Sequence, residues 1–342
     1  MRVRVFAAVG VVAVAALTVL VKLSVLGGSV ADAPAGPAGS LSSSETTSLP
    51  VLSTAGAPTG LAVQARPRQP TVPREFDATS ALTHVRALEA FGVRAGGSEA
   101  ERQTATYIRD RLVELGLDVR VEEFPLPNGG ASRNVIARVA GSSDTVLVLG
   151  AHMDSKPPSP GANDNGSGCG ALLEIAAILA ADPVVPTVEF VFFGSEEIIG
   201  GDPNAHHFGS RHRVSQMSAT ERARTAGMLS VDMIGYGSAF HSRMMQKGPQ
   251  ALSDMVLAYA AREGVPMTFK QDTSATGLSD HEAYEFAGIP ATCVCWRTDP
   301  AYHTAEDVSG HLSAARIATT GTLVLGFLRS LDASELVALT AL

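Results

Sequence analysis

The sequence is poor in cysteine, in aromatic residues and in positive charge, and each shortage excludes a class of protein. Its 342 residues include three cysteines, 5% aromatic residues and a net charge of −8. Three cysteines cannot make a disulfide framework, so a small disulfide-stabilised fold is excluded. Nucleic-acid binding depends on basic surfaces and, for single strands, on aromatic stacking, so we expect no nucleic-acid partner. The 45% hydrophobic content, in contrast, is ample for a large buried core.

The three cysteines are expected to be free, buried thiols. Cys293 and Cys295 lie in a predicted strand, and we expect their side chains to point to opposite faces and to form no bond with each other. Cys169 stands at the start of a predicted helix, where packing is its expected role.

The first 31 residues have the order of a secretory signal. Arg2 and Arg4 precede an apolar run from Val5 to Val21, and a small-residue stretch ends at Ala31. The apolar run is also nearly long enough to span a bilayer, so an uncleaved N-terminal membrane anchor is the alternative. Both interpretations place the rest of the chain outside the cytoplasm, either secreted or tethered to the membrane.

The remaining chain divides into a linker, one folded domain and a tail. Residues 32–75 are rich in Ala, Gly, Pro, Ser and Thr without apolar periodicity, which is typical of a disordered linker. Residues 76–335 alternate apolar strands with helical patterns, which predicts a single α/β domain with a mostly parallel twisted sheet and helices on both faces. Ser98 and Glu101 predict a capping box at one helix start. Residues 336–342 are left as a tail.

One stretch, residues 145–180, organises this domain. The apolar run Val146–Leu149 predicts a buried central strand that delivers His152 and Asp154 at its carboxyl end, where open α/β sheets place their ligands. A turn-rich segment carrying Asp164 comes next, and a helix follows it. The order of these elements indicates a site for a metal ion.

Three further apolar strands are also followed by side chains of the kinds that bind metals. The complete set is His152, Asp164, Glu196, Glu197, Asp232 and His303. Imidazole nitrogens and carboxylate oxygens suit Zn²⁺ and tolerate Co²⁺ or Mn²⁺. Two divalent ions about 3.5–4 Å apart need a carboxylate between them to screen their repulsion. Asp164 is the natural bridge.

Taken together, these motifs resemble a known family. They are HMD at 152–154, GANDNGSG at 161–168, GSEE at 194–197, SVDMIG at 230–235, SDHEAYEFAGIPA at 279–291 and YHTAED at 302–307. They are similar to motifs of the two-zinc aminopeptidases of the secreted bacterial leucyl-aminopeptidase type, whose relatives include glutamate carboxypeptidases and glutaminyl cyclases. The resemblance covers roughly residues 76–335 and implies a zinc-exopeptidase domain with a phosphorylase/hydrolase-type fold.

The resemblance also implies a ligand set and two zinc ions. His152 and Asp232 would bind one ion, Glu197 and His303 the other, and Asp164 both. A cis peptide bond between Asp164 and Asn165 is expected as well.

Three further residues have expected roles in the reaction. By resemblance, Glu196 would be the general acid/base, acting on a hydroxide held between the ions, and Tyr302 would steady the oxyanion. Asp154, two residues after His152, is expected to accept the second N–H of that imidazole and so fix its tautomer.

Other polar residues near these motifs are not expected to bind metal. Asp280 and His281 are expected to shape the pocket and not to bind metal. His206, His207 and His212 lie where the sequence is longer than the family pattern, and a loop at the rim of the site is favoured over a third metal site.

The predicted function is that of an extracytoplasmic metallo-aminopeptidase acting on peptides with a free N-terminus. A carboxypeptidase would need basic side chains to bind a terminal carboxylate, and Arg211, Arg213 and Arg297 keep that alternative open. A glutaminyl cyclase is disfavoured because Tyr302 stands where cyclases tend to carry Trp. A metal-free binding or receptor module is disfavoured because the ligand set is intact. The sequence does not indicate an oligomeric state.

Overall fold

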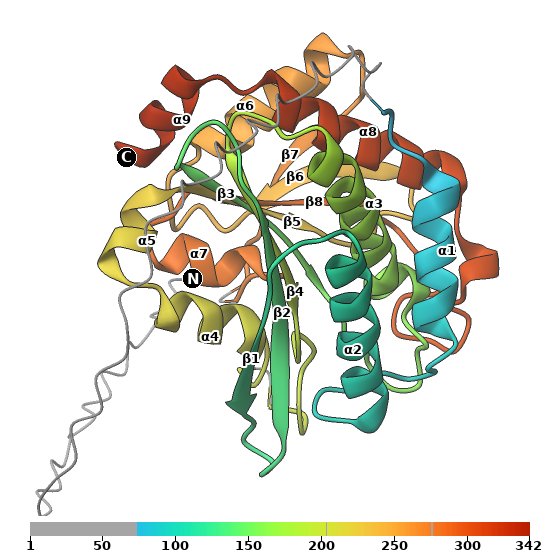
Figure 1. Ribbon diagram of the computed structural model, residues 1–342. Coiled ribbons are helices and arrows are strands. Elements are labelled where there is room, and N and C mark those ends of the chain that lie inside the picture. The colour runs from blue at the N-terminus through green and yellow to red at the C-terminus, as the bar shows by residue number, and fades with distance from the viewer. Residues whose placement is uncertain (1–73, 203, 275) are drawn as a thin grey trace, which may run out of the picture. The chain divides into compact units, whose positions relative to one another are not determined.

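The structure is a computed structural model that describes residues 74–202, 204–274 and 276–342. The predicted signal segment and nearly all of the predicted linker lie outside the described residues. An eight-stranded sheet runs through the described part in the order β1-β2-β4-β3-β5-β8-β6-β7 (Figure 1). The strands are β1 (Val119–Pro125), β2 (Ala131–Val139), β3 (Val146–His152), β4 (Thr187–Phe193), β5 (Thr225–Val231), β6 (Ala239–Met244), β7 (Thr268–Gln271) and β8 (Ala291–Arg297).

The central strands β4, β3, β5 and β8 are parallel, whereas the pairings toward both edges include antiparallel ones. Every residue of β3 and β5 is buried, as is all of β4 after its first residue. Strands covered on both faces need continuous apolar runs, which is why the sequence marks these strands clearly. Edge strand β1 is instead mostly exposed or partly buried, and only Phe124 within it is buried.

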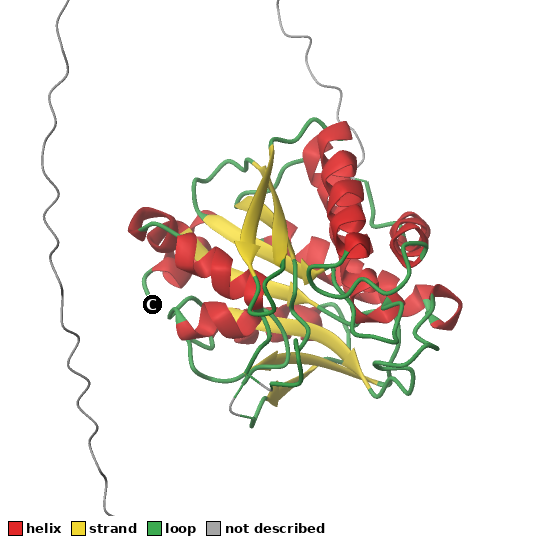
Figure 2. Ribbon diagram, turned by 90° about the horizontal axis from the view of Figure 1, so that it is seen from below, coloured by secondary structure: helices red, strands yellow, loops and turns green. Residues whose placement is uncertain are grey.

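Helices cover both faces of the sheet (Figure 2). The helical elements are α1 (Ala78–Glu89), α2 (Glu99–Glu114), η1 (Ala162–Ser167), α3 (Gly168–Ala181), α4 (Phe208–Gln216), α5 (Ala219–Arg224), α6 (Ala251–Arg262), α7 (His281–Phe286), η2 (Ser309–His311), α8 (Ala314–Ser330) and α9 (Ala333–Thr340). Helices α1, α2, α3, α6 and α8 pack over the larger core, and α4 and α7 pack over the smaller one on the other face. The predicted mostly parallel sheet with helices on both faces is confirmed.

The carboxyl ends of the four parallel strands lie at one edge of the sheet. Strand β3 ends at His152, β5 ends one residue before Asp232, and β4 ends three residues before Glu196. The chain leaves β8 in a long loop that carries His303 before it enters α8. This edge therefore collects the side chains that the sequence singles out.

One predicted capping box is only half formed. The Ser98 hydroxyl accepts the Glu101 N–H at 3.1 Å, as predicted. The Glu101 carboxylate does not return to the Ser98 N–H, however, so the reciprocal half of the prediction is wrong. Its oxygens instead accept the Gly97 N–H at 2.7 Å, the Ser132 hydroxyl at 2.7 Å and the Ser195 N–H at 2.9 Å. Glu101 thus binds the main chain of the loop that follows β4.

The predicted orientation of the strand cysteines is also wrong. All three cysteines are free and buried, as predicted. Residues two apart in a strand share a face, however, so Cys293 and Cys295 point the same way. A hydrogen bond with Cys295, together with burial, raises the pKa of the Cys293 thiol.

The carboxyl-terminal residues 336–342, which the sequence pattern leaves as a tail, include most of helix α9. The Asp332 carboxylate accepts the Ser334 and Glu335 N–H groups and caps this helix. Leu336 and Leu339 are buried in the larger core, and α9 contacts β5. The folded part therefore extends beyond residue 335.

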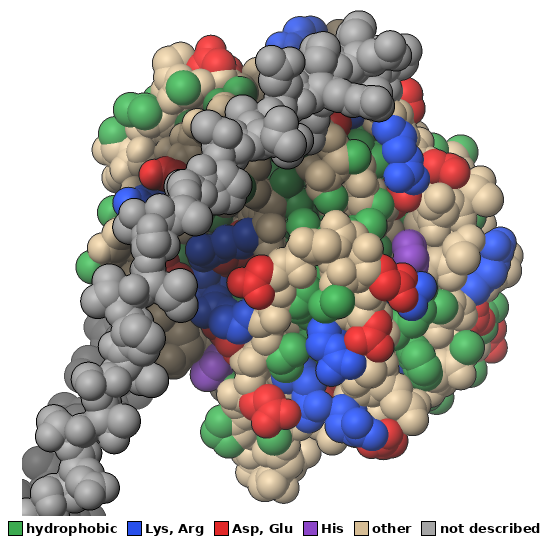
Figure 3. All heavy atoms as spheres, in the orientation of Figure 1, with side chains coloured by type: hydrophobic (Ala, Val, Ile, Leu, Met, Phe, Trp, Pro, Cys, Tyr) green, Lys and Arg blue, Asp and Glu red, His purple; other side chains and the backbone are tan. Residues whose placement is uncertain are grey.

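Acidic and basic side chains are interspersed on the face shown in Figure 3. Helix α2 carries two such pairs of opposite charge, Arg102 with Glu99 and Arg111 with Glu114. None of the helices in the described ranges combines the length and the apolar character needed to cross a membrane.

Candidate active site

Asp164 lies in the turn between β3 and α3, and hydrogen bonds hold the main chain of this turn. The Asn163 and Asp164 N–H groups donate to the two oxygens of Asp307, at 2.6 and 3.1 Å. The peptide bond from Asp164 to Asn165 is cis, as expected. The Asn165 amide donates to the Val231 carbonyl at 2.9 Å, which ties the turn to the end of β5.

A buried arginine side chain also holds this turn. Arg94 is fully buried, and its guanidinium donates to the carbonyls of Met153, Pro160 and Gly161. These bonds link the end of β3 to the entrance of the turn. Arg94 is not recognisable from the sequence, because one arginine outside the motifs carries no signal of its own.

The five predicted ligand residues converge into two groups that share Asp164. In the inner group, His152 Nε2 lies 3.1 Å from Asp164 Oδ1 and 3.6 Å from Asp232 Oδ1. In the outer group, His303 Nε2 lies 3.1 Å from Asp164 Oδ2 and 3.0 Å from Glu197 Oε1. Asp164 therefore presents one oxygen to each group, which is the arrangement expected of a bridging carboxylate.

The carboxylates of these groups favour positive charge on the histidines beside them. Burial opposes the protonated form of His152, but Glu196, Asp154, Asp164 and Asp232 raise its pKa well above the usual value. Burial similarly opposes protonation of His303, yet Asp164 and the neighbouring carboxylate raise its pKa to about 9. Either protonated imidazoles or bound metal ions could balance these carboxylates.

Some carboxylate oxygens of these groups have no hydrogen-bond partner within the described ranges, which also fits a site for metal ions. Asp164 Oδ2 and Asp232 Oδ1 are buried without a hydrogen-bond partner among the described residues. Burial, followed by repulsion from Asp164, raises the pKa of Glu197 to about 8. Buried carboxylate oxygens normally have partners, so these atoms are the ones that a bound cation would satisfy.

Asp154 lies behind the groups, but its main contacts differ from the expected one. Its Oδ1 faces His152 Nδ1 at 3.4 Å, which is longer than an ordinary hydrogen bond. Its two oxygens accept the Glu196 N–H at 2.9 Å and the Glu197 N–H at 3.1 Å. Asp154 thus fixes the main chain that carries both glutamates as well as facing the imidazole.

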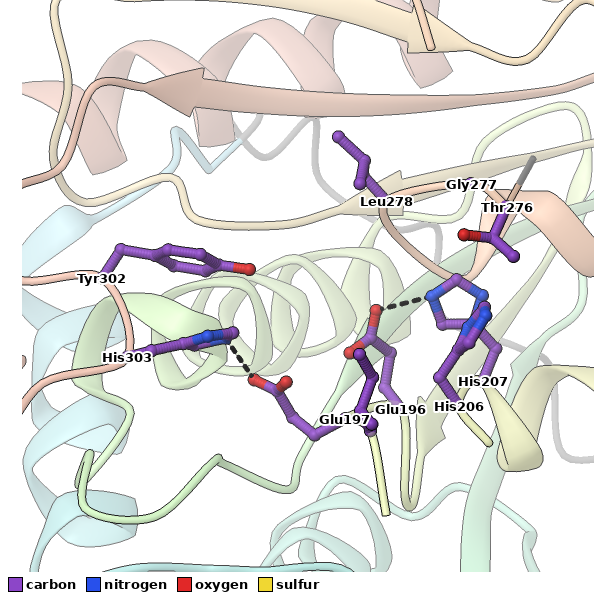
Figure 4. A pocket seen from close by; sticks show the side chains of 10 residues that line it. Glu196, Glu197, His206, His207, Thr276, Gly277, Leu278, Tyr302 and His303 are labelled. Atoms are coloured by element: carbon purple, nitrogen blue, oxygen red, sulfur yellow. Dashed lines mark hydrogen bonds and ion pairs between the residues drawn. The ribbon is translucent and has the colours of Figure 1, made fainter. Parts of the chain in front are cut away.

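Glu196 lies between the inner group and a histidine that the prediction placed only at the rim. Donor atoms of His152, Glu196 and Asp232 lie within 4.8 Å of one another. On its other side, Glu196 Oε1 is 2.9 Å from Nε2 of His207, which is 3% exposed (Figure 4). The sequence places His207 in an extra loop but contains no sign that this loop folds back onto Glu196.

A pocket of about 120 Å³ opens above these carboxylates. Its lining includes the two glutamates together with Ile198, His206, Leu278 and Tyr302. The Tyr302 ring stacks on the His303 ring with 3.7 Å between centroids, and Tyr302 is 42% exposed (Figure 4). A substrate in this pocket would therefore meet an aromatic hydroxyl on one side and the glutamates on the other.

The remaining singled-out residues lie around this centre without joining either group. Asp280 and His281 are fully buried at the start of α7 and do not line the pocket. His212 stacks on Phe124 at 5.0 Å. Cys169 is buried, and its thiol donates to the His152 carbonyl at 3.1 Å.

The three arginines considered for binding a carboxylate have different surroundings. Arg213 is buried and pairs with Glu189, so it is part of the core. Arg211 pairs with Glu282 at 2.5 Å. Arg297 lies over the Tyr302 ring, 5.7 Å from its centroid, and forms no ion pair with a carboxylate of the described residues.

Comparison with known proteins connects this geometry to one family. The model of peptidase family M28 matches residues 134–328. The leupeptin-inactivating enzyme 1 of Streptomyces exfoliatus is 30% identical over 237 residues, which cover 67% of this chain and 50% of the relative. A probable lipoprotein aminopeptidase, LpqL, of Mycobacterium tuberculosis is 35% identical over 47% of this chain and 33% of its own length. The chain thus spans half or less of these curated relatives.

Solved structures share the fold. A zinc aminopeptidase from Bacillus subtilis superposes with a TM-score of 0.67 at 20% identity, covering 74% of this chain and 94% of that one. The match includes nearly the whole of that structure.

Proposed function

Because the chain belongs to peptidase family M28, we propose that it is an extracytoplasmic metallo-aminopeptidase with two Zn²⁺ ions. It would remove residues from peptides that have a free N-terminus. The observation that carries the proposal is the convergence of two histidine–carboxylate groups on the two oxygens of Asp164, with Glu196 beside them. A relative that is named as a probable aminopeptidase supports the same class of reaction.

Each residue has a role in this proposal. His152 and Asp232 would hold one ion, Glu197 and His303 the other, and Asp164 both. When bound, the ions would supply Lewis acidity and lower the pKa of water near them.

Two side chains would act directly on the substrate. Glu196 would accept a proton from the attacking water on a carboxylate oxygen and deliver one to the leaving amine nitrogen. The Tyr302 hydroxyl, which faces the pocket, would donate to the substrate oxygen as negative charge develops on it (Figure 4).

A carboxypeptidase activity is the second candidate, because of Arg297. This guanidinium lies beside Tyr302 and has no carboxylate partner among the described residues. It is therefore the one of the three predicted arginines that is free to bind a terminal carboxylate. Arg211 and Arg213 are already paired.

The location and the segment boundaries are further parts of the proposal. We propose residues 1–31 as a cleaved signal or membrane anchor and residues 32–75 as a linker to the folded domain. The relative named as a lipoprotein aminopeptidase supports a position outside the cytoplasm. Cell fractionation combined with N-terminal sequencing of the mature chain would separate a cleaved signal from an anchor, and recovery in the cytoplasm would contradict both.

The activity is tested with paired substrates and one conservative variant. We expect chelator-sensitive release of amino acids from aminoacyl-anilides and free N-termini, and none from N-blocked peptides. Glu196→Gln should keep the metal content measured by elemental analysis and lose about 10²–10⁴-fold in turnover. Release from the C-terminus of N-blocked peptides would instead favour the carboxypeptidase, and Arg297→Gln should then raise KM.

A further inference from the structure

The loop that follows Glu197 folds back so that its last residue contacts Glu196 twice. The His207 N–H donates to the Glu196 carbonyl at 2.8 Å, and the next two N–H groups of the chain continue this pairing along residues 194–195. The His207 ring then places Nε2 2.9 Å from Glu196 Oε1. His207 has a φ of 54°, in the left-handed region that few non-glycine residues adopt. The main chain of His207 thus holds the main chain of Glu196, and its ring contacts the Glu196 carboxylate.

The other side of the His207 ring faces a second carboxylate. Its Nδ1 lies 3.4 Å from Glu282 Oε1 on helix α7, which is longer than an ordinary hydrogen bond. Arg211 donates to the same Glu282 oxygen, and the Gly277 N–H donates to Oε2. Both ring nitrogens therefore face carboxylates. Burial alone would lower the pKa of His207, but Glu196 and Glu282 raise it to about 10.

This cluster has the composition of a metal site but not the space for an ion. Donor atoms of His206, His207 and Glu282 lie within 4.8 Å of one another. The Arg211 guanidinium contacts both His206 Nε2, at 3.3 Å, and Glu282 Oε1, at 2.5 Å. A cation thus already occupies the position between them. Burial, with His207 and Arg211, lowers the pKa of His206 to about 4, so that ring is neutral.

We propose that His207 is a positioning residue for Glu196: it holds Oε1, so that Oε2 is the oxygen left to exchange a proton with the substrate. Glu282, whose carboxylate is paired with Arg211, faces the other side of the His207 ring. The proposal rests on the proposed function, because it assigns to Glu196 the part of general acid/base. It adds that a loop absent from the shorter family pattern controls the orientation of that base.

The kinetic test compares four variants in the metal-loaded enzyme. His207→Leu removes both ring nitrogens, and we expect kcat to fall about 10- to 100-fold with KM changed less than about threefold, because only the orientation of the base is lost. His207→Gln keeps an N–H donor and should recover most of that loss. Glu282→Gln should give an intermediate loss. His212→Gln, in the same segment but stacked on Phe124, should stay within about twofold of the wild type.

A second readout does not depend on activity. A buried ring N–H bonded to a carboxylate gives a slowly exchanging, downfield proton NMR signal. We expect this signal in the wild type and in His212→Gln, its loss in His207→Leu, and an upfield shift in Glu196→Gln, whose amide is a weaker acceptor. Metal content should be the same in all these proteins.

The outcomes separate this proposal from the proposed function. An active wild type whose kcat survives His207→Leu within twofold overturns the positioning role and leaves the peptidase assignment standing. A wild type that shows the NMR signal but hydrolyses no peptide overturns the assignment, and with it the catalytic meaning of the contact. A third equivalent of metal that disappears in His207→Leu would show that the cluster is a metal site. If His207→Leu does not fold, His207→Gln and Glu282→Gln provide the same comparison.

Discussion

The inner and outer groups of the site use the same kinds of atoms but differ in how they are held. His152 ends a central strand and is 1% exposed, and Asp232 follows the neighbouring strand and is 6% exposed. The His303 side chain is 21% exposed, and it sits in a loop at a φ of 59°. The inner group is therefore part of the sheet, whereas the outer group faces the pocket. Catalytic metal sites need such an open side, because a closed site has no position for substrate.

Replacing the residue shared by both groups should have the largest effect. Asp164→Asn leaves the donors of each group without a charge between them, and removing one partner of a buried charged cluster costs about 3–5 kcal/mol. We expect both equivalents of metal to be lost and activity to fall by about 10³-fold. Elemental analysis and kcat/KM measure the two effects. A variant that keeps both ions would mean that Asp164 does not connect the groups.

The matched pair His152→Ala and His303→Ala should separate the groups. Each variant should lose about one equivalent of metal and most activity. His152→Ala also opens a cavity beside a central strand, so we expect its free energy of unfolding to drop by about 2–4 kcal/mol. His303→Ala, on a partly exposed loop, should lose less than about 1 kcal/mol. Urea unfolding of the metal-free proteins gives both values, and equal losses would contradict the contrast between the groups.

The residue behind the inner group should have a smaller effect than any ligand. Asp154→Asn keeps the shape of the side chain but can accept only one of the Glu196 and Glu197 N–H groups. Changes in residues that orient metal ligands typically cost 10- to 100-fold in affinity or activity, and we expect a loss in that range. Metal titration measures the loss of metal affinity, and kcat/KM measures the loss of activity. An unchanged variant would show that the two main-chain amides are held well enough by the fold alone.

The contrast between the groups also explains how much the sequence could predict. The inner group was predictable because β3 and β5 are apolar runs, and parallel strands bring their carboxyl ends to one edge. The outer group was less directly predictable: Glu197 and His303 also follow apolar strands, but His303 lies in a long loop, and only the motifs pair it with Glu197. The supports were missed. Arg94 and Asp307 contact residues far away in the sequence, and His207 reaches Glu196 only because its loop folds back. The strands that the apolar pattern missed, β6 and β7, are short and lie near one edge of the sheet, where that pattern is weakest.

The smallest expected effect concerns Glu101, which accepts the Ser195 N–H in the loop that follows β4. Burial, with help from Asp154, raises the pKa of Glu101 from 4.5 to about 7. Between these values the folded protein keeps a proton that the unfolded chain has released. The free energy of unfolding should therefore fall as the pH rises through this window.

Glu101→Gln removes this titration while keeping an amide oxygen for the Ser195 N–H. We expect the unfolding free energy of the metal-free variant to fall less than that of the wild type between about pH 4.5 and pH 7, and the two curves to run parallel above it. Denaturant unfolding at a series of pH values measures the difference. Parallel curves throughout the window would mean that Glu101 is ionised in the folded protein. The Gly97, Ser132 and Ser195 contacts would then stabilise its charge against the cost of burial.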